Sequence, residues 1–210
     1  MRAFVYSDGF NFYYGAVRGT PYKWLDVNRM CQLLLPHDEI AQIRYFTALV
    51  SPRPNDPQQA QRQQTFIRAL KTFPNISIHY GSFLANPVTL PLANPTRRQR
   101  TARVIRTEEK GSDVNLASML LVDGFRKRYE VTVVISNDSD LVLPISIVRS
   151  ELGLPVGVVN PRGHPRYELR RVAGFFKRIR KGILEGGQLP PTLTDERGTI
   201  TKPTKWERPG

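Results

Sequence analysis

The chain has one cysteine, Cys31, and three histidines that lie far apart, at His37, His79 and His164. A single cysteine cannot form an internal disulfide, and Cys31 lies in an apolar helical run where a small core residue is expected. No pair of these residues has the spacing of a zinc site. The absences exclude a disulfide framework and a Cys/His metal centre, and they favour a reducing compartment.

Long apolar runs are also missing. None approaches the roughly 20 residues that a membrane-spanning helix needs. The first residues, MRAFVYSDG, have the pattern of a strand rather than of a signal peptide. We therefore expect a cytoplasmic protein with no membrane partner.

Three motifs of phosphate and acyl chemistry are absent: the P-loop GxxxxGKS/T, the dinucleotide fingerprint GxGxxG and the nucleophile elbow GxSxG. An aspartyl-phosphate enzyme would want DxD after the first strand, where this chain has DGFN. Nucleotide binding in the P-loop or dinucleotide mode is therefore not expected.

Positive charge is abundant. Lys and Arg total 31 against 18 Asp and Glu, a formal net charge of +13. Such a balance favours a polyanionic partner, foremost a nucleic acid. The alternative is a generically basic protein that acts at a ribosome or a membrane surface.

Strand-like and helix-like segments alternate along the chain. The predicted strands cover 2–8, 43–49, 76–83, 131–136 and 155–161, and helices of about 10–15 residues separate them. Residues 167–184 are predicted to form a final amphipathic helix. This order predicts an α/β fold: a three-layer α/β/α sandwich with a mainly parallel five-stranded, Rossmann-like sheet. Residues 1–185 form the predicted domain, with 85–107 as a basic loop or hairpin insertion. Residues 186–210, rich in Pro, Gly and Thr, are expected to be a flexible basic tail.

Four aspartates fall where parallel strands end or a helix begins. Asp8 ends the first strand, Asp138 and Asp140 follow the strand at 131–136, and Asp113 opens the helix that precedes it. If the two strands are neighbours, these carboxylates face one crevice. Their repulsion would raise their pKa values or draw a cation, and oxygen ligands alone suit Mg²⁺ or Mn²⁺. The plainer alternative is that each aspartate is a turn or helix-capping residue.

Three motifs, YSDGFN (6–11), KGSDVNLASML (110–120) and VISNDSDLVLPI (134–145), resemble the NYN domain family, a bacterial branch of the PIN-like ribonucleases. The resemblance covers roughly residues 2 to 180. It implies a PIN-like fold and a Mg²⁺- or Mn²⁺-dependent nuclease that acts mainly on RNA. Two positions depart from the family pattern: Asn137 stands where Gly is usual, and Gly174 where Asp is common.

The resemblance also implies roles for individual residues. Asp8, Asp113 and Asp138 would hold the metal, with Asp140 contributing directly or through water. Asn11 would orient Asp8 or contact the phosphate, Ser136 would place a hydroxyl near the site, and Lys110 would meet the substrate backbone. For Lys110 the alternative is a solvated surface charge.

Basic segments at 97–106, 161–171 and 177–181 supply candidate phosphate contacts. The candidates are Arg97, Arg98, Arg100, Arg103, Arg162 and Arg166. Alternatively, many of these are solvated helix faces, or the 85–107 insertion forms a homodimer.

Together these patterns predict a metal-dependent endoribonuclease that prefers single-stranded RNA. The rival hypothesis is an RNA-binding or regulatory module whose acidic site is vestigial and turns over little. A nuclease that also cuts DNA is a third reading.

Overall fold

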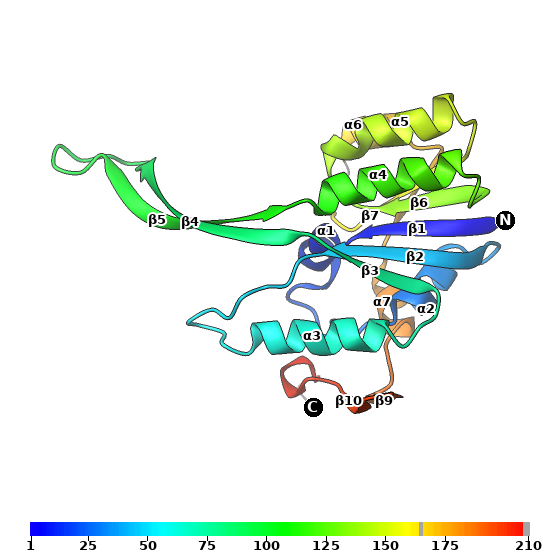
Figure 1. Cartoon of the computed structure of the whole chain (residues 1–210), viewed down its shortest axis with the longest axis horizontal. Helices are drawn as coiled ribbons and strands as arrows, with labels where there is room; N and C mark the ends of the chain where they lie inside the picture. Colours follow the sequence, from blue (N-terminus) through cyan, green and yellow to red (C-terminus); the bar gives the residue numbers. More distant parts are fainter. Residues whose placement is uncertain (164–165, 208–210) are drawn as a thin grey trace.

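The computed structural model describes residues 1–163 and 166–207, and its centre is a twisted parallel sheet of six strands (Figure 1). Every neighbouring pair in this sheet runs parallel. In sheet order the strands are β3 (Ile76–Tyr80), β2 (Glu39–Thr47), β1 (Arg2–Asp8), β6 (Val131–Ile135), β7 (Val156–Asn160) and β8 (Phe175–Arg178). The order reverses between β1 and β6, so the adjacency on which the predicted crevice depends is confirmed.

Helices cover both faces of the sheet, which confirms the three-layer α/β architecture. One face carries α4 (Ser112–Phe125), α5 (Val142–Ser150) and α6 (Tyr167–Val172). The other carries α1 (Gly9–Phe12) with its π-helical continuation η1 (Tyr13–Val17), α2 (Val27–Leu34), α3 (Gln59–Leu70) and α7 (Lys181–Gly186). Alternate residues of β1 pack into the two cores, Val5 into one, and Phe4 and Tyr6 into the other. None of the described helices is long and apolar enough to cross a membrane.

The number of strands was predicted wrongly, because the segment at 167–184 is not one amphipathic helix. It forms α6, then β8, then α7. After Ala173 the backbone turns extended, and the Gly174 N–H donates to the Val156 carbonyl at 2.7 Å. Phe175 pairs with Gly157 of β7, and its ring occupies the space that a side chain at Gly157 would fill. The missing Cβ at Gly157 thus lets a sixth strand dock where helical periodicity predicts a helix.

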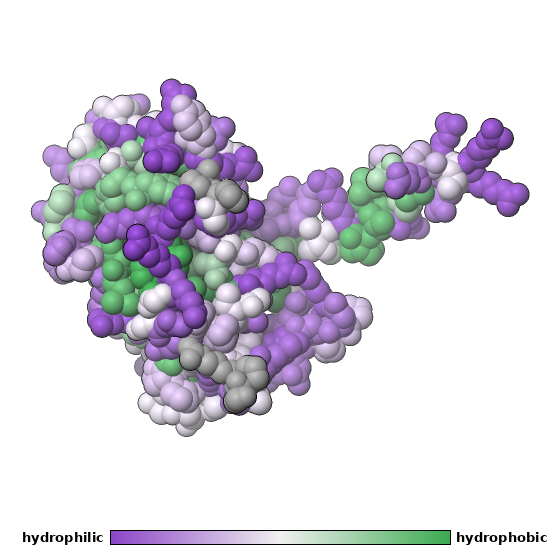
Figure 2. Space-filling model, turned by 180° about the vertical axis from the view of Figure 1, so that it is seen from behind, coloured by the Kyte–Doolittle hydropathy of each residue, from purple (hydrophilic) through white to green (hydrophobic). Residues whose placement is uncertain are grey.

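The insertion at 85–107 lies within a long antiparallel hairpin. Its strands are β4 (Ser82–Pro91) and β5 (Thr101–Lys110), paired along their whole length from Ser82↔Lys110 to Pro91↔Thr101. The hairpin projects away from the sheet (Figure 1), and Figure 2 shows an apolar patch behind a hydrophilic tip. Exposed apolar side chains on it are Leu84, Leu90, Val104 and Ile105. Of the two predicted forms, loop or hairpin, the structure has the hairpin.

The expectation of a flexible tail at 186–210 differs from the structure. The segment contains a hairpin, β9 (Thr192–Asp195) and β10 (Gly198–Thr201), followed by the 3₁₀ turn η3 (Thr204–Trp206). Leu189 and Ile200 are buried against Trp24 and Ala69, and Arg68 Nε of α3 donates to Asp195 Oδ2 at 2.8 Å. Too few apolar residues recur at a regular spacing here to predict this packing. Residues 208–210 lie outside the described part of the chain.

Truncating Ile200 tests whether this segment is part of the fold. Ile200 is only 1% exposed, so Ile200→Ala should lower the free energy of unfolding by about 2 kcal/mol, the low end of the range for such changes. Urea denaturation measures the loss, with exposed Thr199→Ala as the control. Equal stability of both variants would mean that residues 192–201 do not pack on α3.

A cluster of hydrogen bonds and ion pairs around one buried aspartate connects α4 to the sheet. Asp123 of α4, 1% exposed, accepts hydrogen bonds from Tyr6 Oη at 2.7 Å, Arg44 Nε at 2.6 Å and Arg128 Nη1 at 3.0 Å. Burial, and then the hydrogen bond to Asp123, raise the pKa of Tyr6. His79, which packs flat on Phe46, contacts the same Arg44 through its Nε2 at 3.3 Å. The cluster orients α4, whose first turn carries Asp113.

Candidate active site

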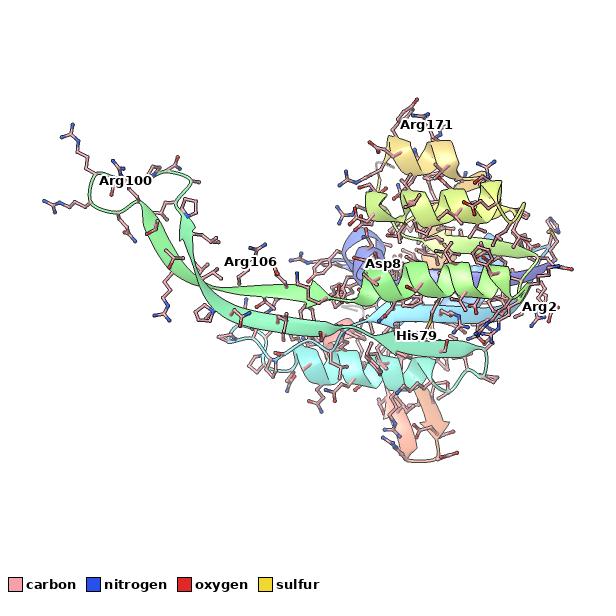
Figure 3. The ribbon with its side chains drawn as sticks, turned by 45° about the horizontal axis from the view of Figure 1, so that its top comes forward. Arg2, Asp8, His79, Arg100, Arg106 and Arg171 are labelled. Carbon is pink, nitrogen blue, oxygen red and sulfur yellow. The ribbon has the colours of Figure 1, made fainter. Side chains whose placement is uncertain are left out.

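Asp8 and Asp138 lie beside each other because their strands do. Asp8 is the last residue of β1, and Asp138 follows β6 after two residues, while Ser7 is paired with Ile135. Figure 3 labels Asp8 at this edge, near the start of α4. The carboxyl ends of both central strands therefore open on one face, as the sequence predicts.

Ser136 links the two aspartates. Its buried hydroxyl donates to Asp8 Oδ2 at 3.0 Å and accepts from the Asp138 backbone N–H at 3.1 Å. Asp138 Oδ1 in turn accepts from the Asp140 N–H at 3.0 Å, which caps the short 3₁₀ turn η2 (Ser139–Leu141). This chain of hydrogen bonds sets the direction of both carboxylates.

Asp8 has the least access to solvent among these acids, at 5% exposed. Its Oδ1 accepts from the Asn11 backbone N–H at 2.9 Å and so caps α1. Burial is the main cause that raises the pKa of Asp8, and the charge of Asp138 adds to it, while Asn11 and Ser136 act against it. The backbone of Asn11 thus holds Asp8 in place, whereas a role of its side chain at the site stays a prediction.

Asp113 faces the same acids from α4. Gly111, with φ of +93°, makes the left-handed turn that starts this helix. Burial raises the pKa of Asp113 to about 6, and the charges of Asp8, Asp138, Glu109 and Asp140 add to the shift. The four predicted acids therefore share one electrostatic field at the junction of β1, β6 and α4.

The carboxylates are neighbours, but they do not converge on one point. Among residues 1–163 and 166–207, no group of three or more His, Cys, Asp or Glu side chains is placed as a metal-ligand set. Asp8 is engaged by Asn11 and Ser136, and Asp138 by the turn of η2. The four carboxylates fit a hard divalent cation, because their only possible metal ligands are oxygen atoms and because a cation would relieve the repulsion between their negative charges.

Glu109 is a fifth acid near the four aspartates, and it is not among the residues predicted from the sequence. Its carboxylate accepts from Ser112 N at 3.2 Å and from Ser112 Oγ at 2.7 Å, so it caps the start of α4. A side chain on Gly81, at the turn between β3 and β4, would collide with Glu109 and with the Lys110 carbonyl. The position of Glu109, three residues before the helix, is a signal that could have revealed it.

The predicted phosphate contacts are spread over the molecule. Lys110 lies at the base of the hairpin, half-exposed, with its Nζ 2.9 Å from Glu108 Oε2. Arg97, Arg98 and Arg100 are exposed at the hairpin tip and Arg103 on β5. Nine ladder steps separate Thr101 from Lys110, about 30 Å at the usual rise of a strand, and Figure 3 shows Arg100 far from Asp8. These arginines are not brought together with the carboxylates.

Arg162 and Arg166 lie beyond the carboxyl end of β7. Asn160 holds the Arg162 backbone, accepting from its N–H at 3.0 Å and donating to its carbonyl at 2.7 Å. The Arg166 N–H donates to Asn137 Oδ1 at 2.9 Å. Asn137, one of the two departures from the family pattern, therefore ties the turn of Asp138 to the segment that carries Arg166.

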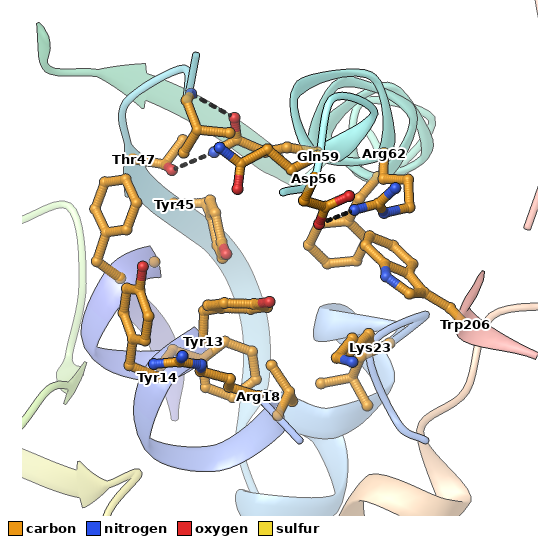
Figure 4. A pocket seen from close by; sticks show the side chains of 18 of the residues that line it. Tyr13, Tyr14, Arg18, Lys23, Tyr45, Thr47, Asp56, Gln59, Arg62 and Trp206 are labelled. Carbon is orange, nitrogen blue, oxygen red and sulfur yellow. Dashed lines mark hydrogen bonds and ion pairs between the residues drawn. The ribbon is translucent and has the colours of Figure 1, made fainter. Parts of the chain in front are cut away.

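An aromatic pocket of about 280 Å³ lies next to the acids (Figure 4). Gly9 and Phe10, which directly follow Asp8, line one side of it, and Tyr45 and Thr47 of β2 another. The aromatic residues of segment 10–14 lie on this wall, but no pattern in the sequence indicates that α3 and Trp206 complete a pocket around them.

The sequence matches the NYN domain family over residues 2–179. The chain belongs to this family. NYN domains fall within the PIN-like nuclease superfamily, whose members typically use divalent metals.

Similar proteins include an enzyme and a protein of known structure. The sequence is 32% identical to 6-hydroxy-3-succinoylpyridine 3-monooxygenase HspA of Pseudomonas putida, over 98% of this chain and 75% of that protein. The crystal structure of a protein of unknown function from Vibrio parahaemolyticus superposes with a TM-score of 0.54 at 16% identity, covering 90% of this chain and 96% of that one. The second likeness supports the fold alone.

Divalent cations should stabilise this NYN domain, and more so above pH 6 than below it. The raised pKa of Asp113, about 6, means that its ionisation lowers stability as pH rises from the ordinary aspartate value toward 6. A cation relieves this repulsion only where the carboxylate is ionised. At ten times its dissociation constant, Mn²⁺ should stabilise by about 1.4 kcal/mol, a melting shift of about 3–6 °C.

Thermal melting with and without Mn²⁺, on either side of pH 6, measures this effect. Asp113→Asn should lose most of the shift, whereas Glu196→Gln, an exposed acid on the β9–β10 turn, should keep it. A shift that is equal in both variants would place the cation elsewhere.

Proposed function

We propose that this protein is a metal-dependent ribonuclease that hydrolyses phosphodiester bonds in single-stranded RNA. The observation that carries the proposal is the shared field of Asp8, Asp113, Asp138 and Asp140 at the carboxyl ends of β1 and β6. A concentrated negative charge inside a protein of net charge +13 is useful where a cation must meet a phosphate. Membership of the NYN family supports the same chemistry.

The four carboxylates would hold Mg²⁺ or Mn²⁺. The Asp8 carboxylate is held by the Ser136 hydroxyl and the Asp138 carboxylate by the Asp140 N–H, while Asp113 approaches from α4. When bound, such an ion neutralises a phosphoryl oxygen and lowers the pKa of a water ligand. Ser136 and Asn11 keep Asp8 in one rotamer, so the charge at this edge is preorganised before the substrate arrives.

The basic surface would hold the RNA on either side of these acids. Lys110, at the base of the hairpin, is the nearest of the predicted cations to Asp113 in the chain, and Arg162 and Arg166 lie beyond β7. The tip arginines Arg97, Arg98 and Arg100, and Arg103 behind them, would contact RNA away from the cleaved bond. Contacts to the phosphate backbone give affinity that falls with salt and carry no sequence information.

The test is incubation of purified protein with end-labelled single-stranded RNA, matched duplex RNA and the same sequence as DNA, with Mn²⁺ or with a chelator. We expect Mn²⁺-dependent internal cuts in the single-stranded RNA. Binding of RNA without metal-dependent cleavage would instead support the RNA-binding or regulatory module. Equal cutting of the DNA would remove the preference for RNA.

A second candidate function is monooxygenation of a small hydroxylated pyridine. The observation that favours it is the likeness to the Pseudomonas putida monooxygenase across nearly the whole chain, joined to an aromatic pocket. The reaction places one atom of O₂ on the ring, while NADH, which supplies two electrons and one proton, and one further proton turn the other atom to water. The test is to measure whether the protein consumes NADH in the presence of O₂ and 6-hydroxy-3-succinoylpyridine. NADH consumption that requires both, together with no RNA cleavage, would establish this candidate and reject the ribonuclease.

A further inference from the structure

The aromatic pocket beside the acids has the features of a ligand site that the nuclease chemistry does not use. Its wall comes from six places in the chain: the segment of α1 and η1, the loop that follows η1, the end of β2, the loop between β2 and α3, α3 itself, and Trp206 of the C-terminal turn η3. Figure 4 shows these side chains around one hollow. Its volume of about 280 Å³ is near the lower limit of small-molecule pockets, roughly 300 Å³, so it has room for one ring system with a substituent.

Flat aromatic faces make up much of this wall. Tyr13 and Tyr14 are partly exposed and meet edge to face, with ring centroids 5.2 Å apart. Trp206 lies opposite, in contact with Phe66 at 6.2 Å between centroids. Exposed aromatic rings that face a cavity offer stacking surfaces for a planar ligand, whereas fully buried rings do not.

The Tyr45 hydroxyl is a polar group on the wall of the pocket. The Tyr45 residue is 5% exposed, and among the described residues its hydroxyl makes no hydrogen bond. In this part of the chain the Ser7 hydroxyl is the only fully buried polar side-chain atom without a partner, so the Tyr45 hydroxyl is open to the pocket. In Figure 4 its side chain points from β2 into the pocket, toward Tyr13. A ligand with a polar ring atom can therefore form a hydrogen bond with this hydroxyl.

Cations gather at the same pocket with too few acids to neutralise them. Arg18, Lys23, Arg53 and Arg62 line it, against the single acid Asp56. Asp56 is already paired with Arg62 and with Lys205, whose Nζ lies 3.2 Å from its Oδ1. Lys23 is partly buried and makes no ion pair among the described residues, and Arg18 lies over the ring of Tyr14. The side chains of the pocket can therefore bind an anionic group as well as an aromatic ring.

We propose that this pocket binds a planar heteroaromatic ring that carries an anionic group, with the ring against Tyr13 and Trp206, a polar ring atom on the Tyr45 hydroxyl, and the anion at Lys23 and Arg18. A nucleotide of an RNA chain has this chemistry, and so does a free heteroaromatic acid. Gly9 and Phe10 place the pocket directly beside Asp8, so either ligand would lie next to the carboxylates. The proposal holds whether or not the acids cleave RNA.

Isothermal titration of the metal-free protein with five probes tests it. UMP, the dinucleotide pUpU and nicotinate combine a ring with an anion, whereas uridine lacks the anion and inorganic phosphate lacks the ring. Two variants remove single contacts: Tyr45→Phe keeps the ring and loses the hydroxyl, and Lys23→Gln removes the charge. Their matched controls are Tyr167→Phe and Lys181→Gln, both on exposed residues outside the pocket.

We expect at least one of the three ring-bearing anions to bind at least about tenfold more tightly than uridine and phosphate. Each pocket variant should weaken this binding about three- to tenfold, with unchanged melting temperature, and the controls should bind as wild type. Tighter binding of pUpU than of UMP, with no nicotinate binding, identifies an RNA nucleotide as the ligand, and the reverse order identifies a free acid. No binding by any ring-bearing anion, equal binding of uridine or phosphate, or unchanged binding in both pocket variants would overturn the proposal.

Discussion

Asp138→Asn should reduce Mn²⁺-dependent cleavage of single-stranded RNA at least about 100-fold, as is typical when one preorganised electrostatic group is lost. Asparagine keeps the oxygen that accepts from the Asp140 N–H, so the turn at η2 should survive while the charge is lost. The charge matters because the acids share one field, in which Asp138 raises the pKa values of Asp8 and Asp113. Single-turnover rates with end-labelled RNA measure the change.

The matched control for this variant is Glu196→Gln, which removes an equal charge from the exposed turn between β9 and β10. Its cleavage rate should equal that of wild type. RNA binding should be kept or slightly strengthened in Asp138→Asn, because less negative charge faces the phosphates. A variant that cleaves at the wild-type rate would remove Asp138 from the proposed site.

Asp123→Ala should lower the free energy of unfolding by about 3–5 kcal/mol, because it leaves a buried charge without its partner. Asp123 accepts hydrogen bonds from Tyr6, Arg44 and Arg128, and the Arg44 side chain is only 14% exposed. Urea denaturation at neutral pH measures the loss. The variant should also cleave RNA poorly at temperatures where it remains folded, since α4 carries Asp113.

Arg128→Ala is the control for the cluster around Asp123. Arg128 contacts the same carboxylate, but its side chain is 44% exposed, so its loss should lower stability by no more than about 1 kcal/mol. Similar losses for Asp123→Ala and Arg128→Ala would mean that the contact between Asp123 and Arg44 contributes little. In that case α4 would be held by its apolar contacts alone.

Most of the fold follows from periodic patterns. Strands β6 and β7 are short runs rich in valine between helical segments. Asp26 precedes an apolar helical run, a position that predicts a helix cap, and its side chain accepts from the Arg29 N–H at 2.8 Å. For α4 the spacing of apolar residues predicts a face of Val114, Ala117, Leu120 or Leu121, and Phe125, and this prediction is only partly right. Leu120 is buried, but Val114 and Phe125 are exposed, whereas Leu116 and Asp123 are buried. Apolar residues surround this helix, so their spacing does not reveal which side packs, and the buried side includes a charged residue.

The candidate acids were predictable because topology alone brings strand ends together. To predict that Asp8 and Asp138 are neighbours, it is enough to know that β1 and β6 are adjacent. The position of Asp113 follows from where α4 begins. The place of Glu109 depends on the β4–β5 hairpin. The pocket that the Tyr45 hydroxyl faces depends on the C-terminal turn, which brings Trp206 beside residues far away in the sequence. Long-range packing of this kind leaves no periodic mark in the sequence.

The central claim, that the carboxylates hold a divalent cation against the scissile phosphate, is tested most directly by metal-ion rescue. A single-stranded RNA with one phosphorothioate at the preferred cut is compared with the unmodified RNA, in Mg²⁺ and in Mn²⁺. Sulfur is a poor ligand for Mg²⁺ and a better one for Mn²⁺. We predict that the modification slows cleavage at least about tenfold in Mg²⁺ and that Mn²⁺ restores the rate. Cleavage that is slowed equally in both ions, or that proceeds in a chelator, would contradict the claim.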